Sequence, residues 1–165
     1  MWIRAETAAD HDAIRRVTEA AFAGAEHASG TEARIVDALR EAGALRLSLV
    51  ADIDGRIAGH VALSPVTLDD GTGGWYGLGP VAVDPRDQRH GVGGALIRAA
   101  LAELPALGAR GCVVLGDPGY YTRFGFRQHT TLRYPEAPPE YFMALSPDDT
   151  LPQARVAYHP AFSVA

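Results

Sequence analysis

Hydrophobic residues recur at helical spacing in two segments near the start of the chain. The first segment follows a short alternating stretch at residues 3–6 and begins behind Thr7, a residue type that caps helices. Its apolar face is formed by Ile14, Val17, Ala21 and Phe22. A second helix is predicted from Thr31 to a stop at Gly43. The segment between them, AGAEHASG, is small and polar, so we expect an exposed loop.

Residues 47–83 change to the alternating period that is typical of strands. Two strands are predicted at residues 47–53 and 57–68, joined by the hairpin turn Asp54-Gly55. After the turn-rich sequence DDGTGG, a third strand spans residues 75–83 and ends at Asp84-Pro85, because proline cannot donate a ladder hydrogen bond. These segments predict an antiparallel meander.

The second half of the chain returns to helical spacing and then to strands. From Gly91 onwards the apolar residues form one helical face, which ends at Pro105. The apolar run Cys112–Leu115 predicts a buried strand that returns parallel to its predecessor, as in a βαβ unit. Prolines restrict later strands to short ones near residues 141–145 and 155–158. The elements predict an α/β (α+β) fold with a mixed, mostly antiparallel sheet of about six or seven strands flanked by helices.

The composition fits one soluble globular domain. A chain of 165 residues with 47% hydrophobic residues can bury a substantial core. Its net charge of -5 argues against binding to nucleic acid or to an anionic membrane, and no apolar run approaches the roughly 20 residues of a membrane-spanning helix. The lone Cys112 cannot form an internal disulfide and the polar start is unlike a signal peptide, so we expect a cytoplasmic protein. We expect a single domain over residues 1–165, with a core of about residues 1–134 and proline-rich C-terminal strands at 135–165.

A glycine-rich turn precedes the most clearly predicted helix. Gly91, Gly93 and Gly94 remove side chains from the first helical turn, whose backbone N–H groups lack partners within the helix. Such a turn can hold phosphate oxygens, and it can equally serve close packing of the helix on the sheet. A dinucleotide fingerprint is excluded because Leu96 replaces its third glycine, and a Walker A loop is excluded because its Lys is missing.

The pattern Gln88-x-x-Gly91-x-Gly93, placed directly after an apolar strand, resembles the coenzyme A pyrophosphate loop of the GNAT superfamily, the Gcn5-related N-acetyltransferases. That family carries Tyr-x-x-x-Gly-Phe after its fifth strand, and this chain has the matching sequence YTRFGF at residues 121–126. The predicted order of elements over residues 1–134 is similar to the family's acyl-CoA N-acyltransferase fold. The segments LGPVAVDP and LGDPGYYTRFGF look most like the YhbS-like predicted acetyltransferases.

The resemblance implies acetyl-CoA as the co-substrate and no metal. It places the pyrophosphate on the backbone amides of the glycine turn and the pantetheine arm beside the preceding strand. A strand N–H near Val81 would bond the thioester carbonyl and then the oxyanion. The cofactor-binding residues implied in this way are Val81, Ala82, Val83, Gln88, Arg89, His90, Gly91, Val92, Gly93 and Gly94.

Tyr121 is the catalytic residue that the resemblance implies. In the family this tyrosine lies beside the thioester sulfur and protonates the departing CoA thiolate. A phenol with an ordinary pKa of about 10 could instead only donate a hydrogen bond. The alternative for a pair of tyrosines is aromatic packing with Phe124 and Phe126, and we expect Tyr120 to pack or to line the cleft.

No residue is an evident base for the amine. Residues 77–83 carry no carboxylate, where many family members have a glutamate on this strand. This leaves a water chain, a residue from another element, or an acceptor whose pKa is already low. Glu26 and His27 lie in the loop that borders the acceptor site in the family, although an ordinary surface loop has the same composition. His60 is expected to be an ordinary strand histidine and Cys112 an inert buried thiol.

The resemblance therefore implies an N-acetyltransferase that moves an acetyl group from acetyl-CoA to a primary amine by direct attack in a ternary complex. The acceptor could be a small molecule or a protein amine. Alternatives are a catalytically silent CoA-binding sensor or scaffold, and an acyltransferase for a longer acyl-CoA, for which Gly77 and Gly79 would leave space. We expect the proline-rich region to cover part of the acceptor cleft with Tyr134, Tyr141 and Phe142. Family members often form dimers, so the resemblance is compatible with a homodimer.

Overall fold

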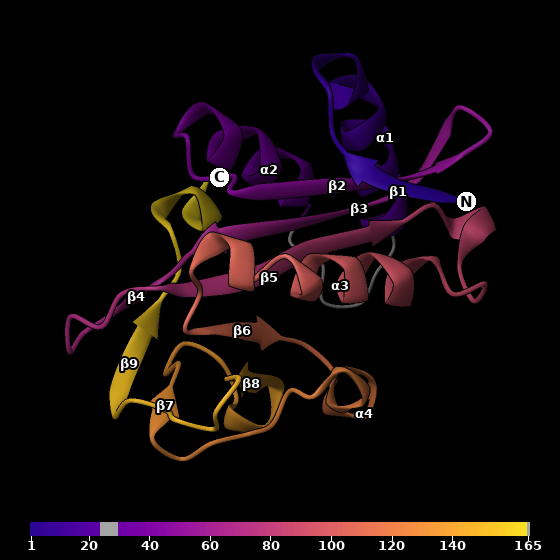
Figure 1. Cartoon of the computed structure of the whole chain (residues 1–165). Helices are drawn as coiled ribbons and strands as arrows, with labels where there is room; N and C mark the ends of the chain where they lie inside the picture. The colour runs from indigo at the N-terminus through magenta and orange to yellow at the C-terminus, as the bar shows by residue number, and fades with distance from the viewer. Residues whose placement is uncertain (24–29, 165) are drawn as a thin grey trace.

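The computed structural model describes residues 1–23 and 30–164, which form a mixed sheet with helices on both faces (Figure 1). The sheet has six strands in the order β1-β2-β3-β5-β6-β8. All neighbouring strands are antiparallel except β5 and β6, which run parallel as predicted. The strands are β1 Trp2–Ala5, β2 Leu47–Ile53, β3 Arg56–Pro65, β5 Trp75–Val83, β6 Gly111–Leu115 and β8 Phe142–Leu145. The predicted mixed, mostly antiparallel α/β fold is confirmed.

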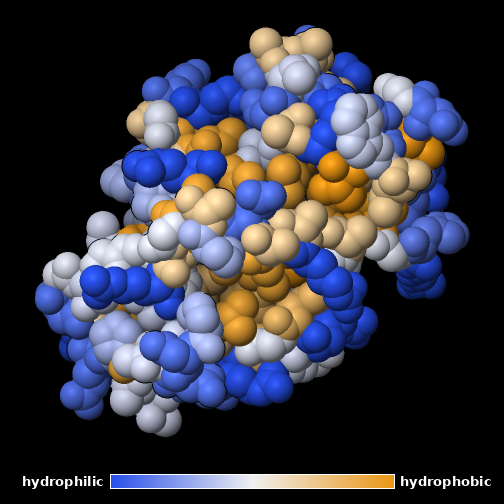
Figure 2. All heavy atoms as spheres, viewed as in Figure 1, coloured by the Kyte–Doolittle hydropathy of each residue, from blue (hydrophilic) through white to orange (hydrophobic). Residues whose placement is uncertain are grey.

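Helices α1 (His11–Phe22) and α2 (Glu32–Glu41) cover one face of the sheet, and α3 (Val92–Ala102) covers the other. Apolar residues of α1 and α2 share a cluster with Val50, whereas those of α3 share one with its neighbour Leu49. Successive residues of a strand point to opposite faces, so the two clusters lie on opposite sides of the sheet. On the α3 side, apolar residues gather in a hollow near the middle of the face (Figure 2). Among the described residues, no helix is both long and apolar enough to cross a membrane.

Gly59 on β3 allows α3 to lie directly on the sheet. A Cβ atom at this position would come within 2.9 Å of Leu96 Cδ1 on α3 and of the Ala82 carbonyl oxygen on β5. A larger residue would therefore push α3 away from the sheet, together with the glycine turn that precedes the helix. The placement of that turn depends on a residue far from it in the sequence.

A second, three-stranded sheet differs from the prediction. The stretch predicted as one strand over residues 57–68 is divided, because β3 ends at Pro65 and the following β4 (Thr67–Leu68) pairs with β9 (Ala154–Ala157). The Val66 N–H still donates to the Trp75 carbonyl on β5 at 3.0 Å, and beyond Val66 the chain takes β9 as its neighbour instead of β5. Strand β7 (Leu132–Arg133) completes this sheet in the order β4-β9-β7. The two short strands predicted in the C-terminal third correspond to β8 and β9.

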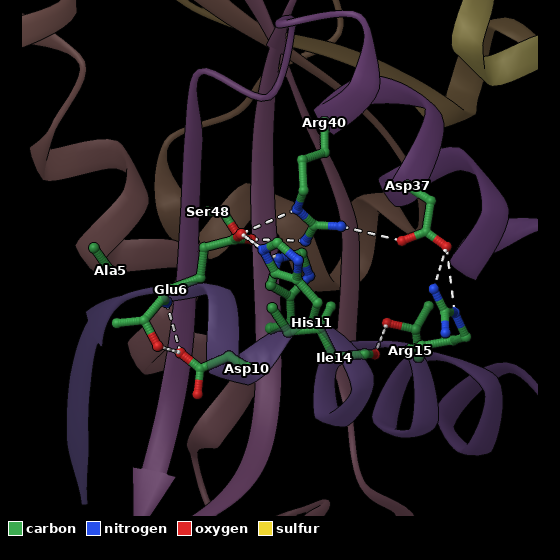
Figure 3. A network of polar contacts seen from close by, with 12 residues as sticks. Ala5, Glu6, Asp10, His11, Ile14, Arg15, Asp37, Arg40 and Ser48 are labelled. Carbon is green, nitrogen blue, oxygen red and sulfur yellow. Dashed lines mark hydrogen bonds and ion pairs between the residues drawn. The ribbon is translucent and has the colours of Figure 1, made fainter.

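A polar network joins α1 and α2 to the sheet beneath them (Figure 3). Glu6, directly after β1, accepts two hydrogen bonds from the Arg40 guanidinium (2.9 and 3.0 Å) and one from the Ser48 hydroxyl. The same carboxylate lies 2.9 Å from His11 Nε2. Burial alone would raise the pKa of Glu6, but the hydrogen bonds from Arg40 and Ser48 hold the pKa below its ordinary value. One carboxylate therefore links α1, α2 and β2.

His60 on β3 lies at the inner end of this network and is fully buried. Because the Ser48 hydroxyl donates its proton to Glu6, the Ser48 oxygen accepts a hydrogen bond from His60 Nε2 at 2.8 Å. The other ring nitrogen, Nδ1, has no hydrogen-bond partner among the described residues. Burial lowers the pKa of His60 to about 4, so the folded protein holds a neutral ring at pH 7.

The depressed pKa of His60 predicts that acid weakens the fold. The unfolded chain takes up a proton at a pKa of about 6.5 and the folded chain only at about 4, so the stabilisation is complete above pH 6.5 and is lost as the pH falls from 6.5 towards 4. The full loss in the free energy of unfolding is about 3 kcal/mol, since one pKa unit corresponds to about 1.4 kcal/mol. Urea unfolding at pH 7.5, 6.0 and 5.0 measures this free energy. His60→Gln should flatten this dependence, and an equal slope in the variant and the wild type would contradict the assignment.

Candidate active site

Strands β5 and β6 pair over three residues only and then separate. Trp75–Gly77 lies beside residues 111–113, and the rest of β5 continues along β3 without β6. Two residues at the point of separation suit this course: Gly79 has a φ of 137°, which favours glycine, and Pro80 has no N–H. Within the part of the chain that the structure describes, one edge of β5 is thereby left without a strand partner from residue 78 onwards.

The hydrogen-bond register shows which backbone groups face this edge. The Asp84 N–H donates to the Ala58 carbonyl on β3 at 2.8 Å. In an antiparallel pair, alternate residues direct their N–H and C=O to the same neighbour, so those of Ala82 also face β3. The N–H groups of Val81 and Val83 consequently face the edge that β6 has left. This is the side on which the sequence predicted a donor near Val81.

The glycine turn is held in place by side chains on both sides of it. Asp87 forms a bidentate ion pair with Arg56 (2.6 and 3.0 Å), and the Gln88 side chain donates to the Val83 carbonyl at 3.0 Å. Arg89 and Gly91 both have positive φ values, 67° and 83°, and Gly91 is the N-cap of α3. These contacts fix the position of the first turn of α3 relative to the end of β5. The free backbone N–H groups of that turn point away from the body of the helix.

These elements enclose a cleft of about 650 Å³ between β5, the start of α3 and the short helix α4 (Pro118–Tyr121). Nine of the predicted site residues line it: Val81, Val83, Gln88, Arg89, Gly91, Val92, Gly93, Gly94 and Tyr121. Ala82 and His90 do not, because the Ala82 side chain is buried in the sheet and His90 is exposed outside the cleft. Glu26 and His27 lie outside the described residues. The structure thus brings two motifs that lie about thirty residues apart to one cleft.

Tyr121 lines the same cleft as the glycine turn. Its ring packs edge-on against Tyr120 and Phe126, with centroids 5.1 and 6.1 Å away. It also covers Gly116, where any Cβ atom would overlap the ring. Burial raises the pKa of Tyr121 to about 12, so the phenol stays protonated at neutral pH. Tyr120 contributes to the aromatic packing and also lines the cleft, as expected.

Two arginines of the cleft were not identified from the sequence. The Arg98 guanidinium lies 4.9 Å above the Phe124 ring, and that of Arg123 lies 4.7 Å above the Tyr120 ring. Both line the cleft, where they add positive charge next to the glycine turn. Arg98 could have been found from the sequence, because it lies one helical turn after Gly94 and therefore on the same side of α3.

Of the three residues expected around an acceptor, Tyr134 and Phe142 line one cavity together, with ring centroids 5.7 Å apart, and Tyr141 is 44% exposed outside it. Tyr134 also lines a second, smaller cavity beside residues 78–80 of β5. The space expected above Gly77 is filled, because a Cβ atom there would lie 2.8 Å from Cε1 of Tyr158. The expectation that Gly77 leaves space for a longer acyl group is therefore wrong. At Gly79, by contrast, an added Cβ atom would meet no atom within 4 Å.

Neither a metal nor a reactive cysteine is indicated. Over residues 1–23 and 30–164, no group of three or more His, Cys, Asp or Glu side chains could hold a metal ion. Cys112 is fully buried in β6, and burial raises its pKa to about 12. A thiol in this state is protonated and unreactive at neutral pH.

The chain matches an acetyltransferase family and solved structures of such enzymes. The model of the acetyltransferase (GNAT) family matches residues 11–126. The chain is 39% identical over 127 residues to the uncharacterised N-acetyltransferase YhbS of Escherichia coli K12, covering 76% of this chain and 73% of that protein.

Two crystal structures resemble the chain over nearly its whole length. A GNAT family acetyltransferase from Brucella melitensis, in complex with acetyl-CoA, is 52% identical with a TM-score of 0.87, covering 98% of this chain and 97% of that chain. The YhbS structure from Escherichia coli, in complex with CoA, is 35% identical with a TM-score of 0.88, covering 99% and 92%.

Gly93 offers a test of the glycine turn. A Cβ atom here would lie 3.3 Å from the Tyr120 hydroxyl and 3.5 Å from Val83 Cγ2, so Gly93→Val adds bulk on the cleft side of the helix. We expect it to weaken acetyl-CoA binding about tenfold or more, measured by calorimetry, since phosphate must approach the backbone closely. Gly73→Val is the matched control, because a Cβ at Gly73 meets no atom within 4 Å. Unchanged affinity in a folded Gly93→Val protein would argue against this turn as the phosphate site.

Proposed function

The chain belongs to the acetyltransferase (GNAT) family, and we propose that it transfers an acetyl group from acetyl-CoA to a primary amine in a ternary complex. One observation carries this proposal: the open edge of β5, the glycine turn and Tyr121 all border the same cleft. The first two are binding elements. Tyr121 is the added element that acyl transfer needs and simple binding does not.

Acetyl-CoA binding is the first part of the proposal. The pyrophosphate would accept hydrogen bonds from the backbone N–H groups at the start of α3, where the helix dipole also favours negative charge. Arg98 and Arg123 supply further positive charge along the same cleft. The pantetheine arm would lie along the open edge of β5 and pair with its backbone like an added strand.

The backbone of β5 is also suited to the acyl-transfer step. The Val81 N–H faces the edge along which the thioester would lie, so it can donate to the thioester carbonyl. When the amine attacks, this oxygen becomes an oxyanion, and a fixed donor then contributes a few kcal/mol to the transition state.

Tyr121 would act on the departing sulfur. Complete transfer of a proton from a phenol of pKa about 12 to a thiolate of pKa about 8.5 would cost about 5 kcal/mol. We therefore propose that Tyr121 stabilises the thiolate by donating a hydrogen bond. The proton that the thiolate finally takes is then released by the amine nitrogen as the amide forms, and it passes through solvent.

The amine must lose a proton before attack, and no carboxylate of β5 can accept it. We propose that the neutral fraction of the amine reacts, with water as the proton acceptor. A silent CoA-binding protein is the second candidate function, favoured by this missing base. An acyltransferase for a longer acyl group is less favoured, because the Tyr158 ring fills the space above Gly77.

Replacing Tyr121 by phenylalanine tests the role of the phenol. The variant keeps the packing against Phe126 and loses only the hydroxyl, so kcat should fall about 10²-fold or more while the Kd of acetyl-CoA changes little. Tyr120→Phe, on the neighbouring ring of the same cleft, is the comparison and should lose less. Thiol release in the presence of an amine panel measures both variants. Equal kcat in Tyr121→Phe and the wild type would remove this role, and a wild type that binds acetyl-CoA but acetylates no amine would favour the silent protein.

The pH dependence of the reaction follows from the same groups. The phenol of Tyr121 remains protonated below a pKa of about 12, whereas an alkylamine of pKa about 10 becomes reactive as the pH rises. We expect kcat/KM for such an amine to rise almost tenfold per pH unit between pH 7 and 9. No descending limb should occur below about pH 11. Initial rates over this range would contradict the scheme if kcat/KM levelled off near pH 7 or fell at pH 9.

A further inference from the structure

A second cavity, of about 290 Å³, lies against β5 where that strand parts from β6. Its wall includes Leu78, Gly79 and Pro80 of β5, the three residues that precede the strand edge of the acetyl-CoA cleft. Phe22, at the end of α1, lines both cavities. A molecule in the second cavity would therefore lie next to the place where the acetyl group is held.

Aromatic rings dominate the rest of this wall. Tyr158 packs edge-on against Tyr134 and at a tilt against Phe162, with centroids 5.2 Å away in both pairs. Together with Phe22, these rings supply four aromatic side chains to one small cavity. Rings in this arrangement offer flat apolar surfaces and negative π-faces, which suit an aromatic group or a cation. The cavity is near the lower end of small-molecule pockets, about 300–1,000 Å³.

Tyr158 supplies a polar atom in this aromatic wall. Its hydroxyl oxygen is buried and has no hydrogen-bond partner among the described residues. Its ring is wedged over Gly77, the last residue of β5 that pairs with β6. A buried hydroxyl without a partner costs about 1–3 kcal/mol, a cost that a hydrogen bond from a ligand would remove.

We infer that this cavity binds the acceptor, and that the acceptor is a small primary amine joined by a short linker to an aromatic ring. The inference rests on the proposed acetyltransferase function. The aromatic group lies between Tyr134, Phe162 and Phe22, and the Tyr158 hydroxyl accepts a hydrogen bond from the amine nitrogen. Tyr158 thereby positions the nitrogen towards the thioester and takes no part in bond making.

A panel of amines tests the class of acceptor. With acetyl-CoA at saturation, kcat/KM for phenethylamine and tryptamine should exceed that for butylamine about tenfold or more, because the ring is buried in the aromatic wall. Spermidine and a lysine peptide should be poorer still. Higher kcat/KM for butylamine, spermidine or the peptide would overturn the inference and leave the acetyltransferase function standing. A preference for hexanoyl-CoA over acetyl-CoA would overturn it as well, since the cavity would then hold the acyl chain.

A binding measurement without acetyl transfer separates the cavity assignment from the proposed acetyltransferase function. Phenethylamine should bind to the CoA-saturated protein in a calorimetric titration. If it binds and no amine is acetylated, the cavity assignment stands and the acetyltransferase function fails. If it does not bind while aliphatic amines are acetylated, the cavity assignment fails.

Tyr158→Phe tests the positioning role within the cavity. Loss of the hydroxyl should raise KM for phenethylamine and lower its kcat/KM about tenfold, with the Kd of acetyl-CoA unchanged. Thermal stability should stay equal or rise, because an unpaired buried hydroxyl is removed; a hydroxyl that served the fold would instead lower Tm. Tyr141→Phe is the matched control, since Tyr141 is exposed and lies outside the cavity. Unchanged amine kinetics in Tyr158→Phe would remove this role.

Discussion

The early end of the pairing between β5 and β6 is the constraint on which the rest of the site depends. Three residues of parallel pairing hold the strands together, and from Leu78 onwards β5 has β3 as its one strand neighbour among the described residues. A closed sheet would use the N–H groups of Val81 and Val83 in its own ladder. The separation leaves these groups facing the cleft instead, and the second cavity lies where the strands part. The proposed binding surface is thus built from backbone that the sheet has left unused.

The parts of the site that could be predicted from the sequence are those that depend on near neighbours. Gln88, Gly91 and Gly93 form one turn, and Tyr121 stands in a short motif beside Gly125, so a local sequence pattern was enough to match both to motifs of the family. The strand β5 was predicted with its correct limits because Asp84-Pro85 ends it. Contacts between distant segments carried no such signal.

The missed features all arise from packing across the fold. Tyr158 fills the space above Gly77 from 81 positions further along the chain, so no local pattern showed that the glycine serves close packing. The break between β3 and β4 depends on β9, which takes β4 as its neighbour. His60 is a strand histidine as predicted, but its polar surroundings could not be predicted, because Glu6 and Ser48 come from other strands and their connections.

Phe22 lines both the cleft proposed for acetyl-CoA and the aromatic cavity, yet the two are separate hollows against successive stretches of β5. In the proposed reaction the two substrates would occupy different hollows, so neither has to leave before the other binds. Direct transfer between them would need no acetylated form of the protein. The order of binding would then be set by the concentrations and affinities of the two substrates.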